Sequence, residues 1–165
     1  MTKRMFMLIG VPASGKSTFR DRTLHRNDWV TVSTDDLIEE AAKLRGGTYD
    51  SVFVDVIDVC TKIAKQKFYD ATREGVPIII DRTNLTPKSR AEWIKHAKRH
   101  GYEIVAVEFA LPSTDAQHEQ WNQRLVRPGK SIPRHVLADM FRNYTPASLD
   151  EGFDFITCVN TWKGS

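Results

Sequence analysis

The sequence is short of several features that assign a protein to a special class. It has only two cysteines, Cys60 and Cys158, which lack metal-binding spacing, so we expect no zinc site or disulfide framework and free thiols in a reducing compartment. No apolar run reaches the ~18 residues of a membrane span. The apolar stretch at residues 5–9 is too short for a secretory signal. We therefore predict a cytoplasmic protein without membrane association.

Charge of one sign is not in large excess either. The 165 residues include 24 basic and 21 acidic side chains, a net charge of +3, which permits a nucleic-acid partner without requiring one. Repeats and low-complexity segments are absent, and 41% of the residues are hydrophobic. We predict a single domain, residues 1–165, with no obligate protein partner.

What is present is a phosphate-binding motif. Residues 10–17 read Gly-Val-Pro-Ala-Ser-Gly-Lys-Ser and fit G-x-x-x-x-G-K-[ST], the P-loop. An apolar run at residues 5–9 precedes the motif, and residues 16–26 follow it with helical spacing, which is the strand–loop–helix order that the motif requires. We expect Lys16 to reach the β- and γ-phosphates of ATP or another NTP, and the Ser17 hydroxyl to ligate Mg²⁺.

The remaining pattern alternates strands and helices. It predicts a parallel α/β sheet of about five strands with helices on both faces. Thr86 and Ser113 are expected N-caps, and Gly101 is an expected C-cap. The expected strands cover residues 5–9, 30–32, 76–80, 103–110 and 153–159, and the expected helices cover residues 16–26, 35–44, 52–73, 87–100, 113–124 and 133–144.

Three acidic residues follow expected strands. Asp35 and Asp36 come after the second strand, and Asp81 directly follows four apolar residues of the third. Ligands of open parallel sheets bind beyond the carboxyl ends of the strands. We therefore expect these carboxylates to lie with Lys16 at the carboxyl edge of the sheet, which we call the rim. Asp35 is favoured as the base that accepts a hydroxyl proton, and Asp81 as a ligand of Mg²⁺ or its waters. The alternatives are a helix cap and a turn-stabilising aspartate.

Basic residues complete the candidate site. Arg82 follows Asp81 and could meet a substrate phosphate or pair with a surface acid. Arg124, Arg127 and Lys130 lie in a segment with Pro128 and Gly129, at about residues 124–132, which we call the lid. A lid arginine can stabilise charge on a transferring phosphoryl group. The alternative is a solvated basic loop.

In this order the motifs resemble the kinase module of polynucleotide kinases. The resemblance extends over nearly the whole chain, through the P-loop with Pro12, Ser-Thr-Asp-Asp-Leu at 33–37, Asp-Arg-Thr-Asn-Leu at 81–85, and Arg-Pro-Gly-Lys-Ser-Ile-Pro at 127–133. It implies a P-loop kinase fold with Asp35 as base and Arg127 as catalytic arginine beside Lys16. The implied nucleotide-binding residues are Gly10, Pro12, Ser14, Gly15, Lys16, Ser17, Thr18 and Arg124.

One departure concerns the acceptor. Phage members of the family carry an arginine three residues after the base, which grips the phosphate of the acceptor end, and this chain has Ile38 there. An apolar side chain cannot make that contact, and Arg82 is a candidate replacement. The substrate-binding set is expected to be Asp36, Ile38, Arg82, Asn84 and Lys130.

The predicted function is ATP- and Mg²⁺-dependent phosphoryl transfer to a nucleic-acid hydroxyl, on DNA rather than RNA and first of all on a 5′ end. The change at Ile38 is also compatible with an internal target, as in phage kinases that phosphorylate 5-hydroxymethyluridine in DNA. A small-molecule kinase, an aminoacyl-tRNA kinase and a non-catalytic nucleotide-binding or ATPase module stay open. The resemblance points to a phage or bacterial source.

Overall fold

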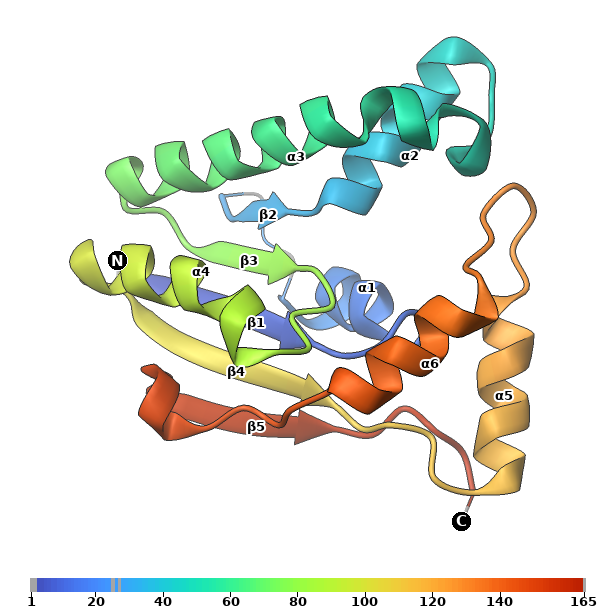
Figure 1. The fold of residues 1–165 in the computed structure, drawn as a ribbon. Coiled ribbons are helices and arrows are strands. Elements are labelled where there is room, and N and C mark those ends of the chain that lie inside the picture. Colours follow the sequence, from blue (N-terminus) through green and yellow to red (C-terminus); the bar gives the residue numbers. More distant parts are fainter. Residues whose placement is uncertain (1–2, 25, 27, 165) are drawn as a thin grey trace.

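The computed structural model describes residues 3–24, 26 and 28–164. A single sheet, in the order β2-β3-β1-β4-β5, runs through the molecule, and every neighbouring pair of strands is parallel (Figure 1). This confirms the predicted α/β fold. The strands are β1 (Arg4–Ile9), β2 (Val30–Val32), β3 (Ile78–Asp81), β4 (Glu103–Phe109) and β5 (Phe155–Val159).

Helices cover both faces of the sheet, as the sequence predicts. In β1, Met5 and Met7 pack in one apolar cluster with side chains of α3 and α4, while Leu8 packs in another with Leu24 from the segment after the P-loop. This division follows from the two-residue period of a strand. The helices are α1 (Lys16–Phe19), α2 (Thr34–Arg45), α3 (Tyr49–Glu74), α4 (Pro87–Arg99), α5 (Asp115–Leu125) and α6 (Arg134–Asn143), with a π-helix, η1 (Arg20–Leu24), and a 3₁₀ helix, η2 (Leu149–Glu151).

Caps explain most helix boundaries. The Thr86 hydroxyl accepts a hydrogen bond from the Ser89 N–H, as expected of an N-cap before Pro87. The helix before it starts earlier than predicted, because Thr48 caps α3 in the same way. These caps satisfy N–H groups that would otherwise lack partners in the first turn.

Four local predictions were wrong. The helix after the P-loop changes to π-helical geometry at Arg20, and His25 within its predicted range lies outside the described residues. Thr114 caps α5, whereas the Ser113 hydroxyl donates to the Gln117 side chain. The helix before Gly101 is capped by His100, and Gly101 follows with a positive φ. Since α5 continues to Leu125, the lid is shorter than predicted and covers residues 126–132.

In the part of the chain that the structure describes, no helix combines the length and the apolar character needed to cross a membrane.

Candidate active site

The P-loop, residues 10–17, joins the end of β1 to α1 at the carboxyl edge of the sheet. Ala13 and Gly15 have positive φ angles of 60° and 102°, which curve the loop tightly. A Cβ on Gly15 would lie 2.8 Å from Thr161 Cγ2, so glycine is needed there for both conformation and space. Successive N–H groups in such a loop can converge on an anion.

Two side chains of the P-loop suit a bound phosphate. The buried Lys16 ammonium donates to the carbonyl oxygens of Gly10 and Val11, each at 2.8 Å. Burial lowers the pKa of Lys16 to about 8, with Asp81 acting in the opposite direction. The Ser14 hydroxyl is buried and has no hydrogen-bond partner among the described residues. A buried cation beside an unsatisfied hydroxyl fits the phosphates of a nucleotide.

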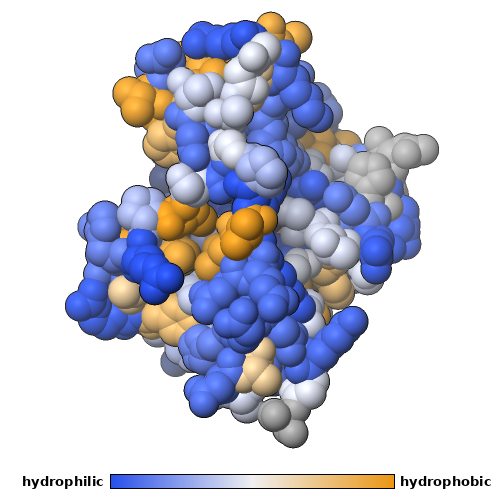
Figure 2. Space-filling view, turned by 90° about the vertical axis from the view of Figure 1, so that its right-hand side faces the viewer, coloured by the Kyte–Doolittle hydropathy of each residue, from blue (hydrophilic) through white to orange (hydrophobic). Residues whose placement is uncertain are grey.

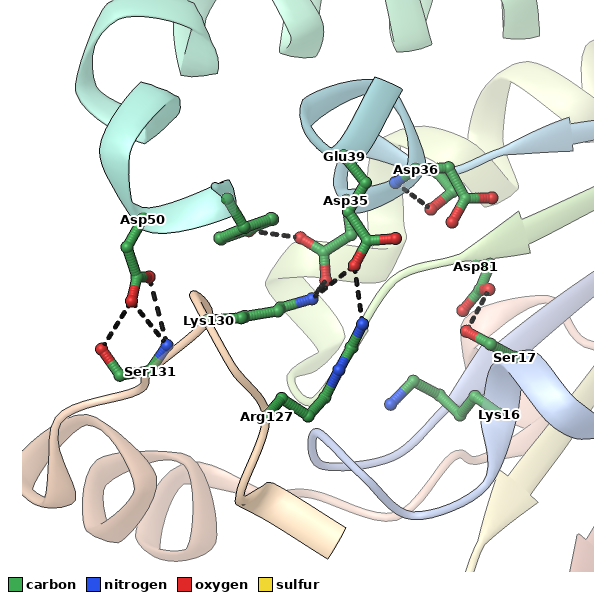
Figure 3. Close-up of polar contacts among 12 residues, drawn as sticks. Lys16, Ser17, Asp35, Asp36, Glu39, Asp50, Asp81, Arg127, Lys130 and Ser131 are labelled. Atoms are coloured by element: carbon green, nitrogen blue, oxygen red, sulfur yellow. Dashed lines mark hydrogen bonds and ion pairs between the residues drawn. The ribbon is translucent and has the colours of Figure 1, made fainter. Parts of the chain in front are cut away.

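Asp81 at the end of β3 faces Ser17 at the start of α1. Ser17 Oγ donates to Asp81 Oδ2 at 3.1 Å (Figure 3). Arg20 Nη1 donates to the same oxygen at 2.7 Å. Burial raises the pKa of Asp81, while Arg20 and Lys16 favour its charged form. A hydroxyl and a carboxylate are oxygen donors of the kind that Mg²⁺ takes, so this pair fits the expected metal.

Arg20 is a central residue of the site that sequence reasoning missed. It is the first residue of the π-helix η1, and its side chain is only 10% exposed. Besides Asp81, its guanidinium contacts Asp36 Oδ2 and Asp21 Oδ1, each at 2.8 Å. A signal existed in the sequence, because Arg20 stands four residues after Lys16 and therefore on the same side of a helix.

The ion pair between Arg20 and Asp81 leads to a testable expectation. Replacing Arg20 with Met leaves Asp81, which is 5% exposed, without the guanidinium that pairs with it directly, and should lower the free energy of unfolding by about 3 kcal/mol. Urea denaturation at neutral pH measures the change. Arg22, an exposed arginine of the same η1 segment, is the matched control, and Arg22→Ala should cost less than about 0.5 kcal/mol.

A double variant separates the ion pair from simple loss of packing. Adding Asp81→Asn to Arg20→Met removes the stranded charge and should recover part of the lost stability. Equal stabilities of the double variant and Arg20→Met would show that the pair is not the cause.

Asp35 points to the other side of the rim, toward the lid. Its Oδ1 accepts a hydrogen bond from the Tyr49 hydroxyl at 2.7 Å, and its Oδ2 accepts one from Lys130 Nζ at 3.1 Å. Although burial alone would raise it, these two partners hold the pKa of Asp35 below its usual value. The Lys130 ammonium also lies 4.3 Å from the centre of the Tyr49 ring. Asp35 is therefore ionised and oriented, while Asp36 is held by Arg20.

The lid is docked on the start of α3. Asp50 accepts hydrogen bonds from the N–H and hydroxyl of Ser131 (Figure 3). The Asp50 N–H donates to the Gly129 carbonyl at 2.8 Å. A Cβ on Gly129 would lie 2.6 Å from Thr48 Cβ. This docking brings the Arg127 guanidinium to 2.9 Å from Glu39 Oε1. The lid cations thus gather across the rim from the P-loop.

Two residues of the expected substrate set serve the fold instead. The Ile38 side chain is fully buried, in a cluster with Ala42 and Val52, and cannot face a substrate. The Asn84 amide is also buried and donates to the carbonyl oxygens of Leu8 and Arg82. These expectations were wrong, because apolar burial and backbone hydrogen bonds use both side chains.

Arg82 remains available at the rim. Its guanidinium lies 5.7 Å from the centre of the Trp93 ring, and it has neither a hydrogen bond nor an ion pair with any residue that the structure describes. Burial lowers the pKa of Arg82, and Asp35 acts in the opposite direction. Arg82 is a partly buried cation without an anion.

Arg124, on α5, stabilises the conformation of the P-loop. Its guanidinium donates to the Ala13 carbonyl and to both Thr161 oxygens, and it lies 4.1 Å from the centre of the Trp162 ring. Beside it, Trp121 Nε1 donates to the Pro12 carbonyl at 2.7 Å. Helix α5, together with Thr161 after β5, which donates to the Ser14 carbonyl at 2.6 Å, therefore holds the P-loop in shape, a role that no motif indicates.

A family model for an AAA domain, AAA_33, matches residues 5–147. The chain belongs to the AAA_33 family. Of the curated proteins, the "putative bifunctional polynucleotide phosphatase/kinase" of Acanthamoeba polyphaga mimivirus is 26% identical over 161 residues, 95% of this chain and 33% of that protein. "Transcription factor bHLH140" of Arabidopsis thaliana is 36% identical over 110 residues, 65% of this chain and 10% of that protein. The chain thus spans a third or less of these relatives.

Among solved structures, a "putative kinase" from Chloroflexus aurantiacus has a similar fold. The TM-score is 0.70 at 17% identity, and the match covers 98% of this chain and 90% of that one. The AAA_33 chain therefore has a P-loop kinase-like fold. Several residues of the candidate site lie together at the carboxyl edge of its sheet (Figure 3): Asp35, Asp81, Arg127, Lys130 and the P-loop.

Proposed function

We propose that this AAA_33 protein is an ATP- and Mg²⁺-dependent kinase that phosphorylates the 5′-hydroxyl of DNA. One observation carries the proposal: the Asp35 carboxylate, oriented by Tyr49 and Lys130, stands across a rim from the P-loop lysine. A base on one side and phosphate ligands on the other suit in-line transfer from ATP to a hydroxyl. The resemblance to polynucleotide kinases and the mimivirus relative support a nucleic-acid acceptor.

Each residue has a role in this proposal. The P-loop backbone, Ser14 and Lys16 bind the β- and γ-phosphates, with Thr18 following Ser17 in α1. Ser17 and Asp81 hold Mg²⁺, which neutralises charge on the phosphates when bound. Asp35 accepts the proton of the attacking hydroxyl, and Arg127 stabilises charge on the transferring phosphoryl group.

Arg82 fits the acceptor side. An unpartnered, partly buried guanidinium suits a phosphate of the acceptor strand, and it supplies the charge that Ile38 does not. Next to it, a hollow of about 290 Å³ separates the loop after β3 from α6, with Leu85, Val136 and Met140 among its lining residues. Figure 2 looks onto this end of the molecule, where hydrophobic side chains gather in a recess between hydrophilic lobes. The lining also includes the hydroxyl residues Thr83, Thr86 and Ser89, and such a mixed apolar and hydrogen-bonding wall beside a cation suits a nucleotide.

The direct test uses γ-labelled ATP, Mg²⁺ and two DNA oligonucleotides. One has an ordinary 5′-hydroxyl, and the other is 5′-blocked and carries internal 5-hydroxymethyluridine. We expect label on the plain 5′ end, and none with a Lys16→Met variant, which loses the phosphate-binding cation.

Other outcomes overturn the proposal in distinct ways. Label only on the blocked strand would move the acceptor to the modified base. Slow ATP hydrolysis without any labelled DNA, and without stimulation by DNA, would favour a nucleotide-binding or ATPase module.

A further inference from the structure

A second hollow lies at the end of the molecule opposite the lid. It measures about 640 Å³ and lies between the final turns of α3 and α4, which end side by side far from the P-loop (Figure 1). None of its residues belongs to the candidate active site. They are Gln66, Tyr69, Arg73, Glu92, Lys95, His96, Arg99 and His100.

Two acids in and beside this groove, Glu92 and Asp70, are already paired. Glu92 accepts a hydrogen bond from the Tyr69 hydroxyl and lies 3.9 Å from Lys65. Asp70 pairs with Arg73 and accepts a hydrogen bond from Gln66. These pairs involve Lys65 and Arg73, and neither Glu92 nor Asp70 compensates Lys95 or Arg99.

Two groove cations have no partner. Lys95 and Arg99 are exposed, and neither forms a hydrogen bond or an ion pair with any described residue. Beside them the His96 and His100 rings lie 4.4 Å apart, and Nε2 of His96 is 3.0 Å from the Thr72 hydroxyl. Burial, His100 and Arg99 lower the pKa of His96, as expected where positive charge is concentrated. An anion would relieve this repulsion.

A line of cations on α4 leads from the rim of the active site toward the groove. Lys88, Lys95 and Arg99 are seven and four residues apart, a spacing that puts them on one face of a helix. Glu92, the acid on this face, is the one already paired with α3. The helix starts directly after the loop that contains Arg82 and Asn84, so the cations form a stripe from the rim to the groove. Tyr69 adds an aromatic ring at the far end.

We propose that the acceptor DNA strand runs from the catalytic rim along α4 and that its backbone phosphates bind in this groove. The inference rests on the proposed function, because it takes DNA as the acceptor. The 13 residues of α4 span about 20 Å, so a strand with the stacked rise of about 3.4 Å per nucleotide needs about six nucleotides to reach the groove. A dinucleotide is too short to reach it even when fully extended, and contacts the rim alone.

The test compares a 20-nucleotide acceptor with a dinucleotide acceptor in the Lys95→Ala/Arg99→Ala variant. Both residues are exposed, so the thermal midpoint should not change. We expect KM for the long acceptor to rise about tenfold at unchanged kcat, and KM for the short one to stay the same. The matched control is Lys43→Ala/Lys67→Ala, which removes two exposed cations outside the groove and should act as native on both acceptors.

Binding supplies a readout that is independent of phosphoryl transfer. With a fluorescent 20-nucleotide DNA that carries a 5′-phosphate, anisotropy measures affinity against salt concentration. Loss of two phosphate contacts should reduce the slope of log affinity against log salt by about 1.4.

The outcomes separate the groove from the proposed function. If the Lys95→Ala/Arg99→Ala variant had a native KM for the long acceptor and a native salt slope, the proposal that DNA binds in the groove would be wrong. If no DNA is phosphorylated by the native protein but DNA binding still depends on Lys95 and Arg99, the groove stands and the proposed kinase activity fails. An equal rise in KM for both acceptors would also contradict the groove, because the short strand cannot reach it.

Discussion

The Arg127→Ala variant is expected to bind ATP as the native protein does and to turn over about 10³ times more slowly. The docked lid holds Arg127 across the rim from the P-loop, paired with Glu39 in an arrangement that leaves its side chain 54% exposed. Exposed ion pairs contribute little stability, so the loss should fall on the chemical step rather than on the fold. Single-turnover rates at saturating ATP, together with calorimetric ATP affinity, measure both quantities.

Arg134 is the matched control for Arg127. It is the first residue of α6, just beyond the lid, and it has no ion pair with the described part of the chain. Arg134→Ala should keep nearly native turnover. An Arg127→Ala rate above one tenth of native, or the same loss of rate in both variants, would show that Arg127 does not stabilise the transition state. The contacts of the lid with α3 would then be structural only.

The sequence was sufficient for most of the fold. Buried parallel strands are continuous apolar runs, so the run before Asp81 and the run before the P-loop were both recognisable. Helix ends were less predictable, because Ser113 and Thr114 are neighbouring hydroxyl residues and either could cap α5. The π-helical turn at Arg20 had no sequence signal.

The candidate site was predictable only where a motif marks it. Lys16 and Ser17 belong to the P-loop motif after β1, and Asp81 ends the apolar run of β3, so the parallel sheet brings them together at one edge. Tyr49 reaches Asp35 because α3 turns back along α2, and Asp50 meets Ser131 across 81 positions of sequence. Contacts between segments so far apart depend on tertiary packing, which local pattern does not encode.

The Asp35→Asn variant is expected to lower kcat by about 10²–10⁴ with ATP affinity retained. An amide can keep the hydrogen bond from Tyr49, yet it cannot accept the proton of an attacking hydroxyl. Since Tyr49 and Lys130 hold the pKa of Asp35 below the usual value of an aspartate, its carboxylate is charged throughout the neutral range. Titration of Asp35 should therefore add no acid limb to kcat between about pH 5 and 8.

Asp36→Asn distinguishes the two neighbouring carboxylates. Asp36 lies 2.8 Å from Arg20 on the P-loop side, so its loss should disturb the Arg20 and Asp81 network and act mainly on the Mg²⁺ dependence of the reaction. Asp58→Asn, at an exposed position of α3, controls for loss of one surface charge. If Asp36→Asn abolished turnover at saturating Mg²⁺ while Asp35→Asn stayed near native, the base would be Asp36, and the contacts that Tyr49 and Lys130 make with Asp35 would serve only to hold the lid closed.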